Sequence, residues 1–279
     1  MYDTYLFIVV WLVKWYDTYK GTSNMKVISV GNNKGGSAKT TTSVNLAVGL
    51  ARQGYKTLLI DLDSQADATS VLVPNRGFSL LVCDVLKDQK HKIKLSDAII
   101  KTAIENLDLL PSHDEEVKSL EIEISSYIQR ELLLSRRREE IEKGGYDYVL
   151  IDLPATSPLI KLISFFISDL VIVPLTPTKF ARNGLDSIAR DVNLVVEQAE
   201  RAIDIKVLLC QVDDRTIGTK KMREHLEQEE LTGFLFRTEI PINIDIEYAH
   251  QNEKSVVEYN PKSLGAIAYQ NLVEEVMNL

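Results

Sequence analysis

The chain has 279 residues, of which 45% are hydrophobic and 26% are charged, and its formal net charge is −8. This length accommodates one sizeable α/β domain or at most two small ones. A protein whose main task is to coat nucleic acid is normally basic, so the charge leaves only a local patch for nucleic-acid binding. Two distant cysteines, Cys83 and Cys210, exclude a disulfide framework or a cysteine metal cluster, as is typical of a reducing cytosol.

The first 24 residues differ from the rest of the chain. They contain both tryptophans and an apolar run at 6–13, which is too short to span a bilayer because a span takes about 20 residues. The flanks of this run are unlike those of a signal peptide. A tethering segment, an added strand or helix, and an extension from a misassigned start all stay open. A strand pattern directly after Met25 favours the last, so we predict an appendage at 1–24 and one domain at 25–279.

From Met25 onward, short apolar runs alternate with helical patterns. In chain order they predict a strand at 27–30, a helix at 39–53, strands at 57–60 and 107–110, a charged helix at 115–142 with a basic cluster at Arg136, Arg137 and Arg138, strands at 148–151, 170–173, 207–209 and 234–236, and a helix from about Ser263 to the end. Continuous apolar strands separated by helices predict an α/β fold, with a doubly wound, mostly parallel sheet and helices on both faces.

A glycine-containing loop joins the first predicted strand to the first predicted helix. Its residues are Lys34, Gly35, Gly36, Ser37, Ala38, Lys39, Thr40 and Thr41. At such a position backbone N–H groups and the helix dipole attract phosphate. We expect Lys39 to contact the β- and γ-phosphates of ATP, and the Thr40 hydroxyl to ligate Mg²⁺. A plain turn before a Thr-capped helix is the alternative, but the order of strand, loop, Lys-Thr and helix favours a nucleotide site.

This loop departs from the standard phosphate loop at both of its glycine positions, which are occupied by Asn33 and Ala38. An alanine before the lysine either crowds the backbone near the phosphate or places a residue with a Cβ at positive φ. We therefore expect ATP binding to persist with altered affinity and turnover.

Other stretches combine with the loop into a specific pattern. They are Leu-Leu-Ile-Asp-Leu-Asp-Ser-Gln at 58–65, Ala68-Thr69, the strand and Asp-Leu-Pro at 146–154, Asp213 with Arg215 and Thr216, Ile240-Pro241, and Tyr259-Asn260-Pro261. With Lys34 as a signature lysine, these stretches resemble the ParA family of partition ATPases within the ParA/MinD superfamily. The resemblance runs from about residue 25 to the C-terminus. It implies a P-loop NTPase of the deviant Walker A type, in the short form without an N-terminal helix-turn-helix domain.

Three aspartates at strand ends complete the predicted active site. Asp63 is the candidate that orients or activates the attacking water, since phosphoryl transfer depends mainly on positioning and charge neutralisation, and it matches the catalytic aspartate of the family. Asp61 and Asp152 are expected to hold the Mg²⁺ shell. A lone aspartate there would more often be a turn or a helix cap, but three at motif spacing favour the site.

The resemblance assigns further roles. It implies that Lys34 crosses a dimer interface to the ATP of the partner, so Lys34, Lys39 and Asp63 form the catalytic set. A solvated turn lysine is the alternative for Lys34. The loop at 34–41, Asp213 and Pro241 are the predicted nucleotide-binding residues.

The leading functional hypothesis is a DNA-partitioning ATPase that is cytoplasmic and nucleoid-associated. The resemblance implies an ATP-dependent homodimer, a centromere-binding ParB-type adaptor and non-specific DNA as partners. A MinD-like membrane-associated positioning ATPase is the alternative, but it would need a basic amphipathic helix near the C-terminus, and residues 272–279 contain two acids and no Lys or Arg. An iron–sulfur reductase would need cysteine ligands for its cluster, and two isolated cysteines do not supply them. An amide- or biotin-type ligase stays open, although it does not explain the stretch at 213–216.

The predicted DNA patch differs from that of the family. A stretch that reads Ile-Pro-Arg-Asn-Val-Arg-Leu-Ser-Glu-Ala in the family reads Ile-Pro-Ile-Asn-Ile-Asp-Ile-Glu-Tyr-Ala at 240–249. Both arginines are replaced, so we expect weaker, more salt-sensitive binding or a relocated patch. The best candidates are Lys220, Lys221 and Arg223, in the first turn of a helix that Thr219 would cap and that would turn Met222 and Leu226 inward. A solvated helix end is the alternative.

Overall fold

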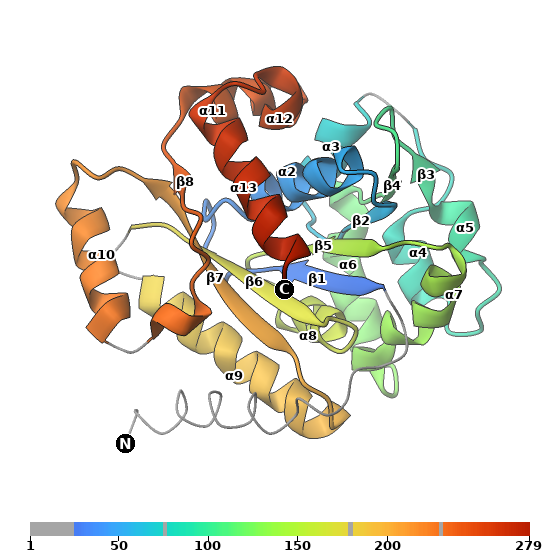
Figure 1. The fold of residues 1–279 in the computed structure, drawn as a ribbon. Helices are drawn as coiled ribbons and strands as arrows, with labels where there is room; N and C mark the ends of the chain where they lie inside the picture. The colour runs from blue at the N-terminus through green and yellow to red at the C-terminus, as the bar shows by residue number, and fades with distance from the viewer. Residues whose placement is uncertain (1–24, 75–76, 178–180, 229–230) are drawn as a thin grey trace.

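A computed structural model describes residues 25–279 except 75–76, 178–180 and 229–230 (Figure 1). The predicted appendage at 1–24 lies outside these residues. Within the described ranges, no helix is both long and apolar enough to cross a bilayer. Cys83 and Cys210 are both buried.

Eight strands form one sheet in the order β3-β4-β2-β5-β1-β6-β7-β8. All neighbours are parallel except the short edge pair β3 and β4. The strands are β1 Lys26–Val30, β2 Thr57–Asp61, β3 Ile100–Lys101, β4 Leu107–Leu110, β5 Tyr148–Asp152, β6 Leu170–Leu175, β7 Asp204–Val212 and β8 Ile240–Pro241. The predicted doubly wound α/β fold is thereby confirmed.

Helices cover both faces of this sheet (Figure 1). One face carries α2 Lys39–Arg52, α3 Asp67–Leu72, α11 Ile244–Gln251, α12 Val256–Tyr259 and α13 Leu264–Met277. The other carries α4 Val82–Lys87, α5 Leu95–Ala98, α6 Asp114–Ile124, α7 Arg138–Lys143, α8 Pro158–Phe165, α9 Ala181–Ala199 and α10 Ile217–Gln228. Successive strand residues point to opposite faces, so Leu58 belongs to one core and Leu59 to the other. This burial on both sides explains the continuous apolar strands.

The parallel register brings the ends of three central strands together. Asp61 at the end of β2 pairs with Asp152 at the end of β5, and Val30 at the end of β1 pairs with the same Asp152. The chain leaves β1 through α2 on one face and β5 through α8 on the other. Ligands of open α/β sheets bind at such a switch point, beyond the carboxyl ends of the strands.

The predicted helix at 115–142 is wrong in its length. The structure has α6, two short 3-10 turns (η1 Arg130–Leu132 and η2 Ser135–Arg137) and then α7. After α6 the Ser125 and Ser126 hydroxyls donate to the carbonyls of residues 122 and 123, and Gln129 adopts φ 55°. Such side-chain bonds compete with helix continuation, and a left-handed residue ends it.

The basic cluster in this region is structural at its centre. Arg137 is 1% exposed and donates to three backbone carbonyls and to the carboxylates of Asp88 and Glu140. Arg138 bonds to Glu142 and to the carbonyl of Ile167. Internal partners therefore account for these two charges.

The predicted strand at 234–236 is also wrong. Residues Leu231–Phe234 form a 3-10 turn, η3, and Leu235 makes only an isolated bridge to Val207. The Glu275 carboxylate then accepts the N–H groups of Arg237 and Thr238 at 3.0 and 3.1 Å. The segment is therefore bonded to α13 as well as to β7, where the Phe236 N–H donates to the Val207 carbonyl at 2.9 Å.

Candidate active site

The Lys34 carbonyl joins the two halves of the loop after β1. The Lys34 carbonyl accepts from Ser37 Oγ at 3.0 Å and from Lys39 Nζ at 3.3 Å, and Lys39 is only 7% exposed. A Cβ added to Gly35 or Gly36 would meet no atom within 4 Å, and Gly36 has φ +69°. The loop thus combines an inward ammonium with open backbone, which is the requirement for binding phosphate.

Ala38, the last loop residue before α2, has φ 66° and ψ 27°. Of the two consequences expected from its replacement of glycine, the structure has the positive φ. A left-handed conformation costs an L-residue about 1–2 kcal/mol. The loop therefore stores backbone strain directly beside Lys39.

Asp152 receives two hydroxyl groups from α2. Thr40 Oγ1 donates to one of its carboxylate oxygens and Ser43 Oγ to the other, each at 2.7 Å. Asp152 is fully buried, and burial raises its pKa to about 8, with nearby Asp61 adding to the effect. The structure thus brings the predicted residues Thr40 and Asp152 together. It adds Ser43, which we did not predict although it lies about one turn after Thr40 on α2.

Asp61 is held from the following helix, α3. Its carboxylate accepts from Thr69 at 2.9 Å (backbone N) and 2.7 Å (Oγ1), and from the Asp63 N–H at 3.1 Å. Burial raises the pKa of Asp61 to about 7, although the Thr69 bonds oppose the shift. Thr69 itself accepts from the Ser112 N–H at 3.0 Å. Two buried carboxyl groups consequently share one end of the sheet.

Asp63 lies two residues beyond Asp61 and is half-buried. Its carbonyl accepts from Ser112 Oγ at 2.9 Å, and its carboxylate accepts the Gln65 N–H at 3.0 Å. These contacts fix the backbone and leave carboxylate oxygen available at the mouth of the site, as a water-orienting residue requires.

Thr40, Asp61 and Asp152 fit a magnesium ion that is shared with a nucleotide. Mg²⁺ usually keeps several waters and binds one or two protein oxygens together with substrate phosphates. The described residues contain no cluster of three or more His, Cys, Asp or Glu side chains suited to a metal. The buried carboxyl groups hold protons at neutral pH when no cation compensates their charge, so a divalent cation would displace those protons.

The predicted nucleotide residues Asp213 and Pro241 lie together at the ends of β7 and β8, where Val212 pairs with Pro241. Arg215 bonds both Asp213 oxygens, at 2.9 and 2.8 Å, and this contact lowers the pKa of Asp213 to about 2. Asp213 and Pro241 therefore lie at the carboxyl ends of the strands, as the phosphate loop does.

The predicted DNA patch is only partly exposed. Lys220 and Lys221 are exposed on α10, but Arg223 forms ion pairs with Asp214 and Glu239. The expected cap is wrong, because α10 begins at Ile217 and it is Thr216 whose Oγ1 accepts the N–H of residue 219, at 3.3 Å. Leu226 is buried and Met222 packs beside it, as expected.

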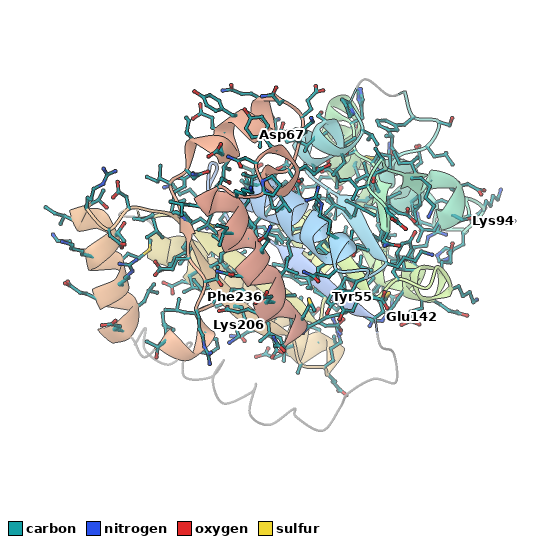
Figure 2. The ribbon with its side chains drawn as sticks, turned by 45° about the horizontal axis from the view of Figure 1, so that its top comes forward. Tyr55, Asp67, Lys94, Glu142, Lys206 and Phe236 are labelled. Atoms are coloured by element: carbon teal, nitrogen blue, oxygen red, sulfur yellow. The ribbon has the colours of Figure 1, made fainter. Side chains whose placement is uncertain are left out.

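A hollow of about 830 Å³ lies away from these side chains, with Lys206, Phe236 and Glu275 in its lining. Figure 2 shows Lys206, Phe236 and Tyr55 well apart from Asp67, which begins α3 near the predicted site. The hollow therefore lies near the amino end of β7, away from the carboxyl ends of the strands. The converging polar groups, and not the size of a cavity, identify the candidate site.

Comparisons with known proteins agree with this geometry. A family model described as an AAA domain matches residues 25–205. The sporulation initiation inhibitor protein Soj of Bacillus subtilis is 35% identical, over 90% of this chain and 98% of its own. The chromosome partitioning protein ParA of Caulobacter vibrioides is 30% identical, over 91% of this chain and 94% of its own. A cobyrinic acid a,c-diamide synthase from Mycobacterium smegmatis, solved with an ATP analogue and magnesium, is 26% identical with a TM-score of 0.75, over 91% of this chain and 95% of its own.

Ala38→Gly should relieve the strain beside Lys39. Glycine adopts positive φ without the Cβ cost but gains entropy in the unfolded chain, so we expect a net stabilisation of up to about 1 kcal/mol and a higher ATP affinity or turnover. Urea unfolding and ATP titration measure both. Ala47→Gly, in the regular part of α2, is the matched control and should destabilise by about 1 kcal/mol. A loss of stability in Ala38→Gly would contradict the strain.

The two raised pKa values also set how stability depends on pH. In the unfolded chain both carboxyl groups titrate near about 3.9, whereas the folded, metal-free protein retains their protons toward about pH 7 to 8. Between these limits the folded state binds more protons than the unfolded state, so the free energy of unfolding falls as pH rises. This contribution is complete below the unfolded pKa and is lost by the time the pH passes the folded values.

Asp152→Asn should flatten this dependence. The amide does not titrate, so only Asp61 keeps a raised pKa in this variant. The melting temperature without Mg²⁺ and nucleotide should therefore fall less between about pH 5 and pH 8 than in the wild type. Asp97→Asn, at an exposed position on α5, is the control and should keep the wild-type slope. Equal slopes in all three proteins would contradict the buried pair.

Proposed function

Because the chain belongs to the ParA family of ATPases, we propose that it partitions DNA as a homodimer that forms with ATP and Mg²⁺ and separates after hydrolysis. The expected ATPase activity and the expected cofactors, ATP and Mg²⁺, are confirmed. Relatives named for chromosome partitioning support the biological role. The observation that carries the proposal is the loop with two lysines: Lys39 turns inward onto the Lys34 carbonyl, and the next residue, Thr40, donates to Asp152.

In this proposal each residue serves phosphoryl transfer by position and charge. Lys39 neutralises the β- and γ-phosphates, and the loop N–H groups bind their oxygens. Thr40, Asp61 and Asp152 hold the Mg²⁺ shell, and Mg²⁺ supplies charge neutralisation at the phosphates. Asp63 accepts a hydrogen bond from the attacking water and aligns it with the γ-phosphorus. Asp213 and Pro241 form the nucleoside side of the site.

Lys34 acts between subunits. One inward lysine already serves the loop, and the Lys34 carbonyl is the acceptor that holds it. We assign the Lys34 ammonium to the ATP of the second subunit, where it adds a charge-assisted bond that exists only while the γ-phosphate is present. ATP then joins the two subunits, and hydrolysis weakens the contact.

The competing functions have less support. A MinD-like membrane role would require a basic face on a helix such as α13, but the last turns of α13 carry Glu274 and Glu275. A ligase role agrees with the synthase similarity, but the identity to Soj is higher and spans nearly all of that protein. We therefore keep partitioning as the conclusion, with residues 25–279 as the ATPase domain and 1–24 as an appendage. A centromere-binding ParB-type adaptor and a cytoplasmic, nucleoid-associated location belong to the same proposal.

DNA contacts in this proposal come from α10 and not from α11. At the start of α11 the chain has Ile242 and Asp245 in place of arginines. Lys220 and Lys221 are exposed, whereas two acids neutralise Arg223. Two phosphate-binding lysines give weak binding that disappears as salt rises.

One aspartate variant and one lysine variant separate ATP binding from dimerisation. Asp63→Ala should bind ATP, lose turnover by about 10²–10⁴-fold and accumulate as a dimer, whereas Lys34→Ala should bind ATP and stay monomeric. Size-exclusion chromatography with ATP and Mg²⁺ distinguishes the two, and Lys39→Ala, which should lose tight ATP binding, is the control. A Lys34→Ala dimer as stable as the wild-type dimer would remove the role between subunits.

DNA retention across a salt series tests the α10 patch. The log–log slope of binding against salt should flatten by about 0.9 for each DNA phosphate that the protein no longer neutralises, so Lys220→Ala/Lys221→Ala should be less salt-dependent than the wild type. Lys90→Ala, at an exposed position outside α10, should keep the wild-type slope. Absence of wild-type retention at low salt and saturating ATP would overturn DNA binding, and an unchanged slope would overturn this patch.

A further inference from the structure

A buried lysine stands behind the phosphate loop and has no part in the site described above. Lys161 lies on α8, is 4% exposed, and donates from Nζ to Oδ1 of Asn33. It also lies near Asp191 on α9, with 3.8 Å between Nζ and Oδ2. Burial lowers the pKa of Lys161, while Asp191 and Glu121 oppose that shift.

This position is unfavourable for a cation in three ways. An ammonium group has three donors, and within the described residues only Asn33 is at hydrogen-bonding distance, since 3.8 Å is too long for a bond to Asp191. Lys161 is the fourth residue of α8, where the helix dipole disfavours positive charge. The Lys39 ammonium repels it as well. An ammonium group with one hydrogen bond and one distant carboxylate is poorly compensated for its burial, so the fold alone does not explain the lysine.

The hydrogen bond from Lys161 to Asn33 connects α8 to the start of the phosphate loop. Asn32 Nδ2 donates to the Pro174 carbonyl on β6 at 2.6 Å, and Asn32 Oδ1 accepts the Lys34 N–H at 3.2 Å. Asn33 is held from the other side by Lys161. The backbone on both sides of Lys34 is thus anchored, because its carbonyl also accepts from Ser37 and Lys39.

We propose that Lys161 is a positioning residue that anchors Asn33 and thereby fixes the backbone from which Lys34 reaches the ATP of a second copy of this chain. The inference rests on the role of Lys34 between subunits. It adds a second, buried lysine to the dimer switch, acting through the loop and not on the nucleotide. The Asp191 carboxylate balances its charge without taking the bond to Asn33.

Dimerisation measured apart from ATP binding tests this role. The proteins are full-length wild type, Lys161→Met, Asn33→Ala, the double variant, Lys34→Ala, and the exposed-site control Lys90→Met. Sedimentation with Mg²⁺ and a non-hydrolysable ATP analogue gives the dimer dissociation constant, and titration at dilution gives the affinity of the monomer for the analogue. Thermal unfolding shows whether each variant folds.

We expect Lys161→Met and Asn33→Ala each to weaken the dimer by about tenfold or more, and the double variant to be no weaker than either single one, because both break the same link. Monomer affinity should stay within about threefold of wild type, and Lys161→Met should still fold, with a lower melting temperature because Asp191 loses its charged partner. Additive losses, an unchanged dimer, or a loss of monomer affinity would overturn the inference. If Lys34→Ala itself dimerises normally, the proposed role of Lys34 fails; if only Lys161→Met does, the inference alone fails.

Discussion

Two carboxyl groups that share a dry position at the end of the sheet are the constraint on which the site depends. The parallel register sets Asp61 beside Asp152, and both are fully buried. Their side-chain hydrogen-bond partners are the hydroxyl groups of Thr40, Ser43 and Thr69, which carry no charge. Such a pair keeps protons at neutral pH unless a cation arrives. The site therefore suits a divalent cation that binds together with the nucleotide.

The phosphate loop is held in place next to these two carboxyl groups. Ala38 carries left-handed strain, Lys39 rests on the Lys34 carbonyl, and Asn32 and Asn33 tie the loop entry to β6 and α8. The two asparagine side chains are short, so they hold the loop entry close to an internal strand and to a helix. A loop held in this way can respond to the γ-phosphate without a large movement of the fold.

The sequence predicted most of the sheet and the polar centre, because continuous apolar strands and strand-end acids are local patterns. It missed contacts made across the fold: Thr69 to Asp61, Ser112 to Asp63 and Lys161 to Asn33. Serine and threonine are too common for spacing alone to reveal their partners. The overlong helix at 115–142 failed because composition does not show where Gln129 turns left-handed. The Thr219 cap failed because Thr216, three residues earlier, occupies that role.

Calorimetric counting of protons tests the central claim most directly. Titrating the wild-type protein with ATP and Mg²⁺ near pH 7, in buffers that differ in ionisation enthalpy, gives the number of protons released on binding. The buried pair should release about one to two protons, since deprotonated carboxylates are needed beside the cation. Binding heats that do not depend on the buffer would show that Asp61 and Asp152 hold no exchangeable protons, and would contradict this account of the site.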